Sequence, residues 1–269
     1  MLSTSLDRKG WRVTPLAFLR TPLILAILLS GCAPGTPEPL QGDRLEVMQT
    51  LQHDLGAYTQ GLIVRDGYFW ESTGLNGASS LRRIDATSGE ILERRELPER
   101  FFGEGLAALE GRLYQLTWRH GIGFIYGAKA LDSIGTFAYS GEGWGLTTDG
   151  SQLIMSDGTY RLRFLHPETF EVTRVLEVSD RGRAVFALNE LEWVDGEIWA
   201  NIWQQDNIAR IDPSTGEVVG WLNVGGFISW WDRVRGAEVA NGIAYDSVSG
   251  RLWVTGKNWP RIYEVRLPS

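Results

Sequence analysis

One acidic residue of the chain, Glu104, lies within a short pattern that occurs in five copies. Each copy contains a Gly-Leu pair or a close variant, and the position just before the pair reads Gln60, Glu104, Trp144, Asn189 and Asn241. If the copies met in space, the Glu104 carboxyl would lie beside tryptophan and be partly withdrawn from water. Such burial raises the pKa of a carboxyl and suits it to proton transfer near neutral pH. On spacing alone, Glu104 could equally accept backbone hydrogen bonds at the end of a sheet.

The spacing of the copies predicts a fold that would bring these side chains together. Successive copies lie 44, 40, 45 and 52 residues apart, and about 40–50 residues is the size of a four-stranded propeller blade. Asp-Gly between alternating strands is the strongest short-range signal of a two-residue hairpin turn. Asp-Gly or a similar pair follows the first strand of every copy, at Asp66-Gly67, Glu110-Gly111, Asp149-Gly150, Asp195-Gly196 and Ser249-Gly250. We therefore predict an all-β, five-bladed β-propeller with two-residue turns at these pairs.

The two ends of the repeat region predict how the ring closes. Residues 45–51 alternate like a strand but precede the first copy, and the last blade lacks a strand after residues 261–267. We expect the N-terminal strand to complete the last blade. The irregular segment 223–239 is expected to hold a loop or a short helix on that blade. Residues 43–269 would then form one propeller domain.

The first 42 residues have the character of an export signal and a tether. Basic residues precede the apolar run 23–29, which is shorter than the ~20 residues that a spanning helix needs, so residues 1–31 are interpreted as a signal peptide. Residues 29–32 (Leu-Ser-Gly-Cys) resemble the bacterial lipobox, in which the cysteine is lipidated. An incidental cysteine after an ordinary signal is the alternative. Residues 32–42 would tether a lipid-anchored Cys32 on the periplasmic side of a bacterial membrane, and Ala33 favours the outer membrane.

Charge and motif content argue against several function classes. A net charge of -7 without a basic run argues against nucleic acid and against docking on anionic lipid, so membrane contact is expected only through Cys32. The single cysteine excludes an intramolecular disulfide and any cysteine-rich metal site. His53, His120 and His166 lack the spacing of metal ligands or of a catalytic triad, and no Gly-rich phosphate loop opens a helix. We expect a monomer with no metal and no cofactor.

Other side chains at the expected strand ends could form a pocket around Glu104. Trp118, Trp144 and Trp203 would face the mouth of the channel, where they could wall a small apolar box. Lys257 could contact a carbonyl there or simply be solvated. Gln60 and Asn189 could merely cap backbone groups at the axis.

The motifs at these positions resemble those of the plant and bacterial glutaminyl-peptide cyclotransferases. The matching segments run in order from about residue 45 to 267 and include 58–62, 71–74, 102–106, 143–146, 156–159, 188–192, 199–203, 241–245 and 255–257. The resemblance implies a five-bladed propeller that acts on an N-terminal glutamine of peptides or proteins. The implied reaction forms pyroglutamate and releases ammonia, without catalytic zinc.

Carried over by position, the resemblance assigns the catalytic role to Glu104. It implies that the substrate is bound by Gln60, Trp118, Trp144, Asn189, Trp203 and Lys257. Ala240, where the family tends to have leucine, and Asn258 depart from the pattern. Both lie at the expected outer rim of the site and leave the catalytic set intact.

Two other function classes stay open on the sequence alone. A propeller hydrolase or sugar-oxidising enzyme with calcium in its channel would need several acids facing the axis, and Glu104 is the one acid at the aligned position. A non-enzymatic binding scaffold is also common among propellers. Such a scaffold would have no reason to keep a lone acid among tryptophans.

Overall fold

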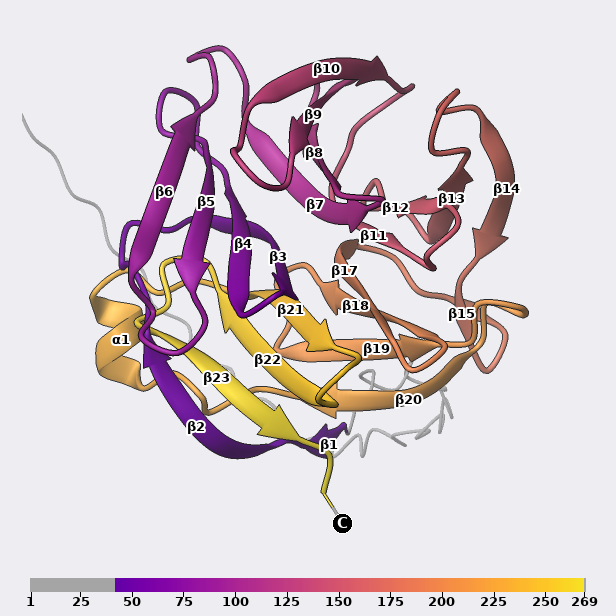
Figure 1. Cartoon of the computed structure of the whole chain (residues 1–269). Coiled ribbons are helices and arrows are strands. Elements are labelled where there is room, and N and C mark those ends of the chain that lie inside the picture. Colours follow the sequence, from indigo (N-terminus) through magenta and orange to yellow (C-terminus); the bar gives the residue numbers. More distant parts are fainter. Residues whose placement is uncertain (1–41, 269) are drawn as a thin grey trace, which may run out of the picture. The chain divides into compact units, whose positions relative to one another are not determined.

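Each copy of the repeat forms one antiparallel sheet, with the repeated pattern on its innermost strand. The computed structural model describes residues 42–268, in which five such sheets surround a common axis (Figure 1). Each inner strand contacts the inner strands of both neighbouring sheets, which closes the ring. The chain is therefore an all-β, five-bladed propeller, as the repeat spacing predicts.

The first three blades each consist of four strands that are consecutive in sequence. The first blade contains β3 (Thr59–Arg65), β4 (Tyr68–Thr73), β5 (Ser80–Asp85) and β6 (Ile91–Glu96). The second contains β7 (Gly103–Leu109), β8 (Arg112–Thr117), β9 (Ile122–Gly127) and β10 (Ser133–Ala138). The third contains β11 (Leu146–Thr148), β12 (Leu153–Met155), β13 (Arg161–Leu165) and β14 (Val172–Glu177).

The last two blades follow the same plan after a small hairpin of β15 (Ser179–Asp180) and β16 (Arg183–Ala184). The fourth blade contains β17 (Leu188–Val194), β18 (Glu197–Ile202), β19 (Asn207–Ile211) and β20 (Val218–Asn223). The fifth takes three strands from the C-terminal part, β21 (Ala240–Asp246), β22 (Arg251–Gly256) and β23 (Arg261–Arg266). Its fourth strand comes from elsewhere in the chain.

That fourth strand is β2 (Glu46–Gln52), which pairs antiparallel with β23 and confirms the predicted closure. The preceding β1 (Asp43–Arg44) was not predicted; it runs parallel to β20 as a fifth strand of the fourth blade. Segment 223–239 contains the short helix α1 (Trp230–Val234), which begins with a capping box formed by Ser229 and Asp232. The Tyr263 hydroxyl donates to the Phe227 carbonyl (2.6 Å), which fastens this segment to the last blade as expected.

Three of the five expected two-residue turns are confirmed and two are wrong. Asp66-Gly67, Glu110-Gly111 and Asp195-Gly196 join their strands directly, with positive φ at both residues. The connections after β11 and β21 are four residues long instead, 149–152 and 247–250. Here an aspartate side chain shapes the turn, since Asp149 Oδ1 accepts from the backbone N–H of Ser151 and Gln152 at 2.8 Å each. Asp246 Oδ1 accepts from Val248 N in the same way.

The glycine of the repeated pair allows neighbouring inner strands to meet at the axis. A methyl group on Gly105 would collide with the backbone around Leu146 of the next blade, and one on Gly145 with the backbone of Asn189. In the fourth copy this position is Glu190, whose side chain crosses to other blades. Its Oε1 accepts from Leu62 N (3.3 Å) and its Oε2 from Ile243 N (2.9 Å). Glu190 thus links the inner strands of three blades.

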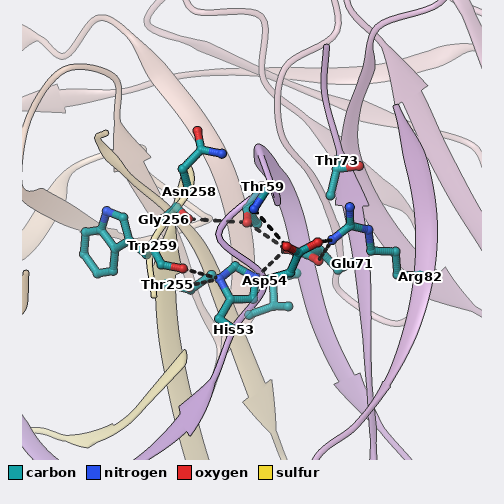
Figure 2. Close-up of polar contacts among 12 residues, drawn as sticks. His53, Asp54, Thr59, Glu71, Thr73, Arg82, Thr255, Gly256, Asn258 and Trp259 are labelled. Atoms are coloured by element: carbon teal, nitrogen blue, oxygen red, sulfur yellow. Dashed lines mark hydrogen bonds and ion pairs between the residues drawn. The ribbon is translucent and has the colours of Figure 1, made fainter. Parts of the chain in front are cut away.

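A buried polar cluster around His53 fastens the two ends of the ring together (Figure 2). His53 follows β2, and its Nδ1 and Nε2 lie 2.9 Å from the Trp259 carbonyl and from Glu71 Oε1. Glu71 also accepts from Thr59 Oγ1 (2.7 Å) and lies 3.5 Å from Arg82 Nη1. Because both ring nitrogens face acceptors, the geometry fits a doubly protonated imidazole.

The electrostatics of this cluster agree with the geometry. Burial lowers the pKa of His53, but the Glu71 carboxylate outweighs burial and leaves that pKa raised above 6.5. Burial likewise raises the pKa of Glu71, and His53 and Arg82 together leave it lowered below 4.5. Because the pKa of His53 is raised in the folded state, its interactions stabilise the fold fully at pH values below its unfolded-state pKa. This stabilisation is lost as the pH rises through the folded-state pKa. Because the pKa of Glu71 is lowered in the folded state, its interactions stabilise the fold at pH values above its unfolded-state pKa, and this stabilisation is lost as the pH falls through the folded-state pKa.

We predict that His53→Gln leaves the Glu71 carboxylate buried without its main partner and lowers the free energy of unfolding by about 3–5 kcal/mol. The pair stabilises the wild type fully between pH 4.5 and 6.5, so the variant should lose most stability there and show a flatter decline at higher pH. Thermal unfolding followed by circular dichroism from pH 5 to 9 measures this. The exposed His166 provides the control variant His166→Gln, and equal curves for both variants would contradict the prediction.

Candidate active site

A repeated break in strand pairing aims the ring side chains at one end of the axis. In four blades the inner strand slips by one residue against its neighbour, between Thr59 and Gly61, Gly103 and Leu106, Leu188 and Leu191, and Ala240 and Ile243. Such a β-bulge leaves a residue unpaired and redirects its side chain. The bulges fall on the ring residues Gln60, Glu104, Asn189 and Asn241. Trp144 of the third blade lies just before β11, where its backbone N–H donates to the Ser156 carbonyl (3.1 Å).

Three of the five ring side chains form a continuous chain of hydrogen bonds. Asn241 Nδ2 donates to Gln60 Oε1 (2.9 Å), and Gln60 Nε2 donates to Glu104 Oε1 (3.0 Å). All three residues are buried. The Asn189 backbone carbonyl accepts from Ser156 Oγ (2.7 Å), while no partner within residues 42–268 binds its side-chain amide. Gln60 therefore orients Glu104, and Asn189 keeps a free donor.

The backbone of Glu104 is held from both neighbouring blades. Ser72 of the first blade donates its hydroxyl to the Glu104 carbonyl, and Gln115 donates to that hydroxyl (2.8 Å). On the other side, Gly105 N donates to the Trp144 carbonyl of the third blade (2.7 Å). Among the described residues, no donor reaches Glu104 Oε2. Gln60 thus fixes one carboxyl oxygen and leaves the other without a donor in this part of the chain.

The surroundings of Glu104 raise the pKa of its carboxyl group. Burial raises the pKa of Glu104 well above 4.5; the Lys257 ammonium lowers it and the Glu142 carboxylate raises it further. Lys257 is only 4% exposed, and burial lowers its own pKa against the pull of Glu104 and Glu238. A carboxyl with a raised pKa can both accept and return a proton near neutral pH.

Aromatic rings near Glu104 form two groups, and the rings within each group contact one another. Tyr58 packs edge-on against Phe102 (6.2 Å between centroids), and Phe102 packs against Trp118 (5.6 Å). Trp144 packs edge-on against Trp203 (5.6 Å), which is 42% exposed at the rim. The predicted tryptophans therefore do lie at one end of the axis, as parts of these two groups.

Residues that the sequence did not single out complete the site. Lys257 Nζ lies 4.8 Å from the centroid of the Tyr58 ring, whose hydroxyl donates to Glu238 (3.0 Å). Both indole N–H groups of Trp118 and Trp144 donate to Glu142 Oε2, at 2.8 and 3.0 Å. Tyr58, Phe102 and Glu142 each stand two places before a ring residue. Side chains two apart along an extended chain share a face, and this spacing was the signal that could have identified them.

Two further buried acids lie on β17, and one of them, Glu190, takes the place of the glycine in the repeated pattern. Glu190 and Glu192 are both buried, and Glu192 accepts from Tyr245 N (2.8 Å) and Thr147 Oγ1 (3.3 Å). Burial raises the pKa of Glu192 to about 8 and that of Glu190 well above 4.5. Within the described part of the chain, no group of three or more metal-ligating side chains is placed to hold an ion.

Comparison with known proteins places this chain in a family. Residues 23–267 match the family model described as glutamine cyclotransferase. The chain belongs to the glutamine cyclotransferase family. It is 42% identical over 233 residues to a glutaminyl-peptide cyclotransferase of Arabidopsis thaliana, covering 84% of this chain and 72% of the plant protein. The crystal structure of Myxococcus xanthus glutaminyl cyclase matches with a TM-score of 0.75 and 38% identity, over 84% of this chain and 98% of that one.

These matches confirm the resemblance read from the motifs, and the family fold accounts for the whole ring. Nearly all of the Myxococcus enzyme is covered, so the cyclotransferase fold is shared as a unit and not as single blades. The roles of the individual side chains rest on the geometry above.

The charge on Lys257 should control the protonation of Glu104. Because Lys257 lowers the pKa of Glu104, we predict that Lys257→Met moves the titration of the Glu104 carboxyl to higher pH. Carboxyl NMR of protein labelled at glutamate side chains measures the shift, with Glu104→Gln used to assign the signal. Lys129 is exposed, so Lys129→Met serves as the control. An unchanged or lowered Glu104 pKa in Lys257→Met would refute the assignment.

Proposed function

We propose that this chain is a glutaminyl-peptide cyclotransferase in which Glu104 transfers the proton. The enzyme converts an N-terminal glutamine of peptides or proteins to pyroglutamate and releases ammonia. Family membership supports the reaction. The observation that carries the role of Glu104 is its burial beside Gln60, which donates to one carboxyl oxygen, while no donor among the described residues reaches the other.

The reaction asks little of the protein, because the nucleophile belongs to the substrate. The α-amine of the glutamine attacks the carbon of its own side-chain amide, a new C–N bond closes the ring, and the former amide nitrogen leaves as ammonia. Holding the side chain folded back toward the amine makes the attack effectively unimolecular and removes much of its entropic cost. A free α-amine has a pKa near 8, which leaves a reactive neutral fraction at neutral pH.

Glu104 would carry the proton between the two nitrogens. As a carboxylate it accepts the proton that the attacking amine loses, through the oxygen that Gln60 does not bind. It then returns this proton to the departing amide nitrogen, so that ammonia leaves as a neutral molecule. The donor Gln60 holds the other oxygen in place during both steps.

The remaining residues would bind the glutamine and the developing negative charge. The free side-chain amide of Asn189 and the Lys257 ammonium are donors at the same end of the axis as Glu104, where they could stabilise the amide oxygen during attack. Trp118, Trp144 and Trp203 would exclude water and pack on the aliphatic part of the side chain.

We predict that Glu104→Gln retains the fold and reduces ammonia release from a glutaminyl dipeptide by at least about 10²–10⁴-fold, since the amide cannot shuttle the proton. A coupled ammonia assay measures the rate, and circular dichroism checks the fold. Glu110, an exposed turn residue of the same blade, gives the control Glu110→Gln, which should keep the wild-type rate. A folded Glu104→Gln enzyme with wild-type turnover would remove Glu104 from the mechanism.

We also propose that the propeller of residues 43–269 is exported and held at a membrane by a lipid on Cys32. The predicted signal peptide, Cys32 and residues 33–41 of the tether lie outside the described residues, and the basic and apolar order of residues 1–32 supports the proposal. Within residues 42–268, no helix is apolar and long enough to span a bilayer. The first strand of the described chain, β1, lies on the outer edge of the fourth blade.

We predict that Cys32→Ser abolishes lipid labelling. Expressed in a Gram-negative host with a labelled fatty acid, the wild type should carry the label and partition into the detergent phase of a Triton X-114 separation. The variant should carry no label and stay in the aqueous phase. Identical labelling and partitioning of both proteins would contradict the anchor.

A further inference from the structure

One carboxylate of the site accepts hydrogen bonds from the indole groups of two different blades. We infer that Glu142 is a positioning residue of the cyclotransferase, which fixes the indole rings of Trp118 and Trp144 beside Glu104. The inference rests on the proposed function for its kinetic part. Its structural part concerns the two indoles alone.

The geometry around Glu142 is that of a shared acceptor. Trp118 follows β8 of the second blade and Trp144 precedes β11 of the third, yet both donate their indole N–H to the same oxygen, Glu142 Oε2. An indole N–H can only donate a hydrogen bond, so an acceptor at this point fixes the plane of each ring. Removal of the carboxylate would leave both rings free to turn.

Glu142 is itself held on three sides. Arg119 Nε donates to its other oxygen, Oε1 (3.0 Å), and the Arg119 guanidinium lies 3.7 Å from the centroid of the Trp118 ring. Arg163 Nη2 donates to the Glu142 backbone carbonyl (3.1 Å). Next to it, Gly143 N donates to the Trp118 carbonyl (2.9 Å). The carboxylate is therefore a fixed point from which the two indoles are placed.

The two indoles contact the other aromatic rings of the site and so influence their positions. Trp203 packs against Trp144, and Phe102 packs against Trp118. A change at Glu142 would thus loosen both aromatic groups at once. A displacement of about 1 Å in the groups that seat a substrate can cost about 10²-fold in rate.

The charge of Glu142 also acts on Glu104. Burial raises the pKa of Glu142, but hydrogen bonds from Trp144, Trp118 and Arg119 outweigh it and leave that pKa lowered, so Glu142 is ionised at neutral pH. This negative charge raises the pKa of Glu104. The other charged or titratable groups that interact with the two acids are Lys257, Tyr58, Tyr139, Arg119 and Arg163. Two carboxyl groups whose pKa values are driven apart fit one proton carrier and one permanent charge.

The chain contains a matched cluster away from the site. Glu197 Oε2 accepts from the indole N–H of Trp199 (3.0 Å), and Arg210 donates to both oxygens of Glu197 at 2.8 Å. This cluster stands at the start of β18, whereas Trp203 of the site follows the end of the same strand. Substitution of Glu197 removes the same type of contact without touching the mouth.

The test compares Glu142→Gln and Glu142→Ala with Glu197→Gln and Glu197→Ala in the full chain. The readouts are kcat and KM for ammonia release from a glutaminyl dipeptide over pH, thermal stability, and near-UV circular dichroism of the indoles. Glu142→Ala should lower kcat/KM by about 10²-fold, with a higher KM and a lower kcat, and should change the near-UV signal. Glu142→Gln keeps an acceptor for the indoles and should lose less activity. Because it removes a negative charge, the pKa of Glu104 should fall and the acid limb of the kcat profile should move to lower pH.

Both Glu197 variants should keep wild-type kinetics and pH profile. If Glu142→Ala keeps kcat/KM within about twofold of Glu197→Ala, the inference is wrong. Should Glu142→Ala fail to fold, a Glu142→Gln enzyme with unchanged kcat/KM and an unchanged acid limb overturns it equally. An absence of ammonia release in the wild type would defeat the proposed function instead. The near-UV comparison would then still decide whether Glu142 places the indoles.

Discussion

The inner strands of the five blades must approach one another closely at the axis, and the site depends on how the chain meets that constraint. Gly105 and Gly145 leave room for the backbone of the next blade. The bulges beside them turn Gln60 and Glu104 away from the regular strand pairing and toward the mouth. In the fourth blade the constraint is met differently, since Glu190 replaces the glycine and binds backbone N–H groups of two other blades. The same close approach therefore stabilises the ring and brings together the side chains that we propose for catalysis.

The chain buries several carboxylates, and their partners decide what each can do. Glu71 has a cationic His53 and the Arg82 guanidinium beside it, which outweigh burial and keep its pKa low. Such a group is structural, because two basic side chains face its charge. Glu190 accepts one backbone N–H group on each oxygen and links blades in this way. Glu104 has one neutral donor, Gln60, and burial keeps its pKa raised.

When the nucleophile is part of the substrate, the reaction rate depends strongly on the residues that line the site. One proton carrier and a few donors are enough for the bond changes, so rate depends on how firmly the folded-back glutamine is held. Under the proposed function, aromatic rings contributed by different blades would hold the glutamine. Hydrogen bonds to Glu142 connect the rings of the second and third blades. By this inference, Glu142, which lies outside the ring of aligned residues, contributes to the site as Glu104 does within it.

The sequence by itself determined the number of blades, the all-β fold, the closing strand and the position of Glu104. Each of these follows from a local pattern: a period of 40–52 residues, an Asp-Gly pair between alternating runs, or a polar residue before a Gly-Leu pair. Local patterns failed where a side chain shaped a turn, as Asp149 does in the longer connection after β11.

The tertiary structure alone decided which distant side chains meet. Glu190 binds the backbone of Leu62 across 128 residues, and Glu142 binds Trp118 across 24. The bulges that aim Glu104, and the choice of His53 as the partner of Glu71, likewise depend on how neighbouring blades pack. No periodicity records such contacts, because they depend on the distance and direction between strands that only the closed ring sets. The repeated pattern identified Glu104, and the packing of the five sheets buries it in surroundings that raise its pKa, as the proposed proton transfer requires.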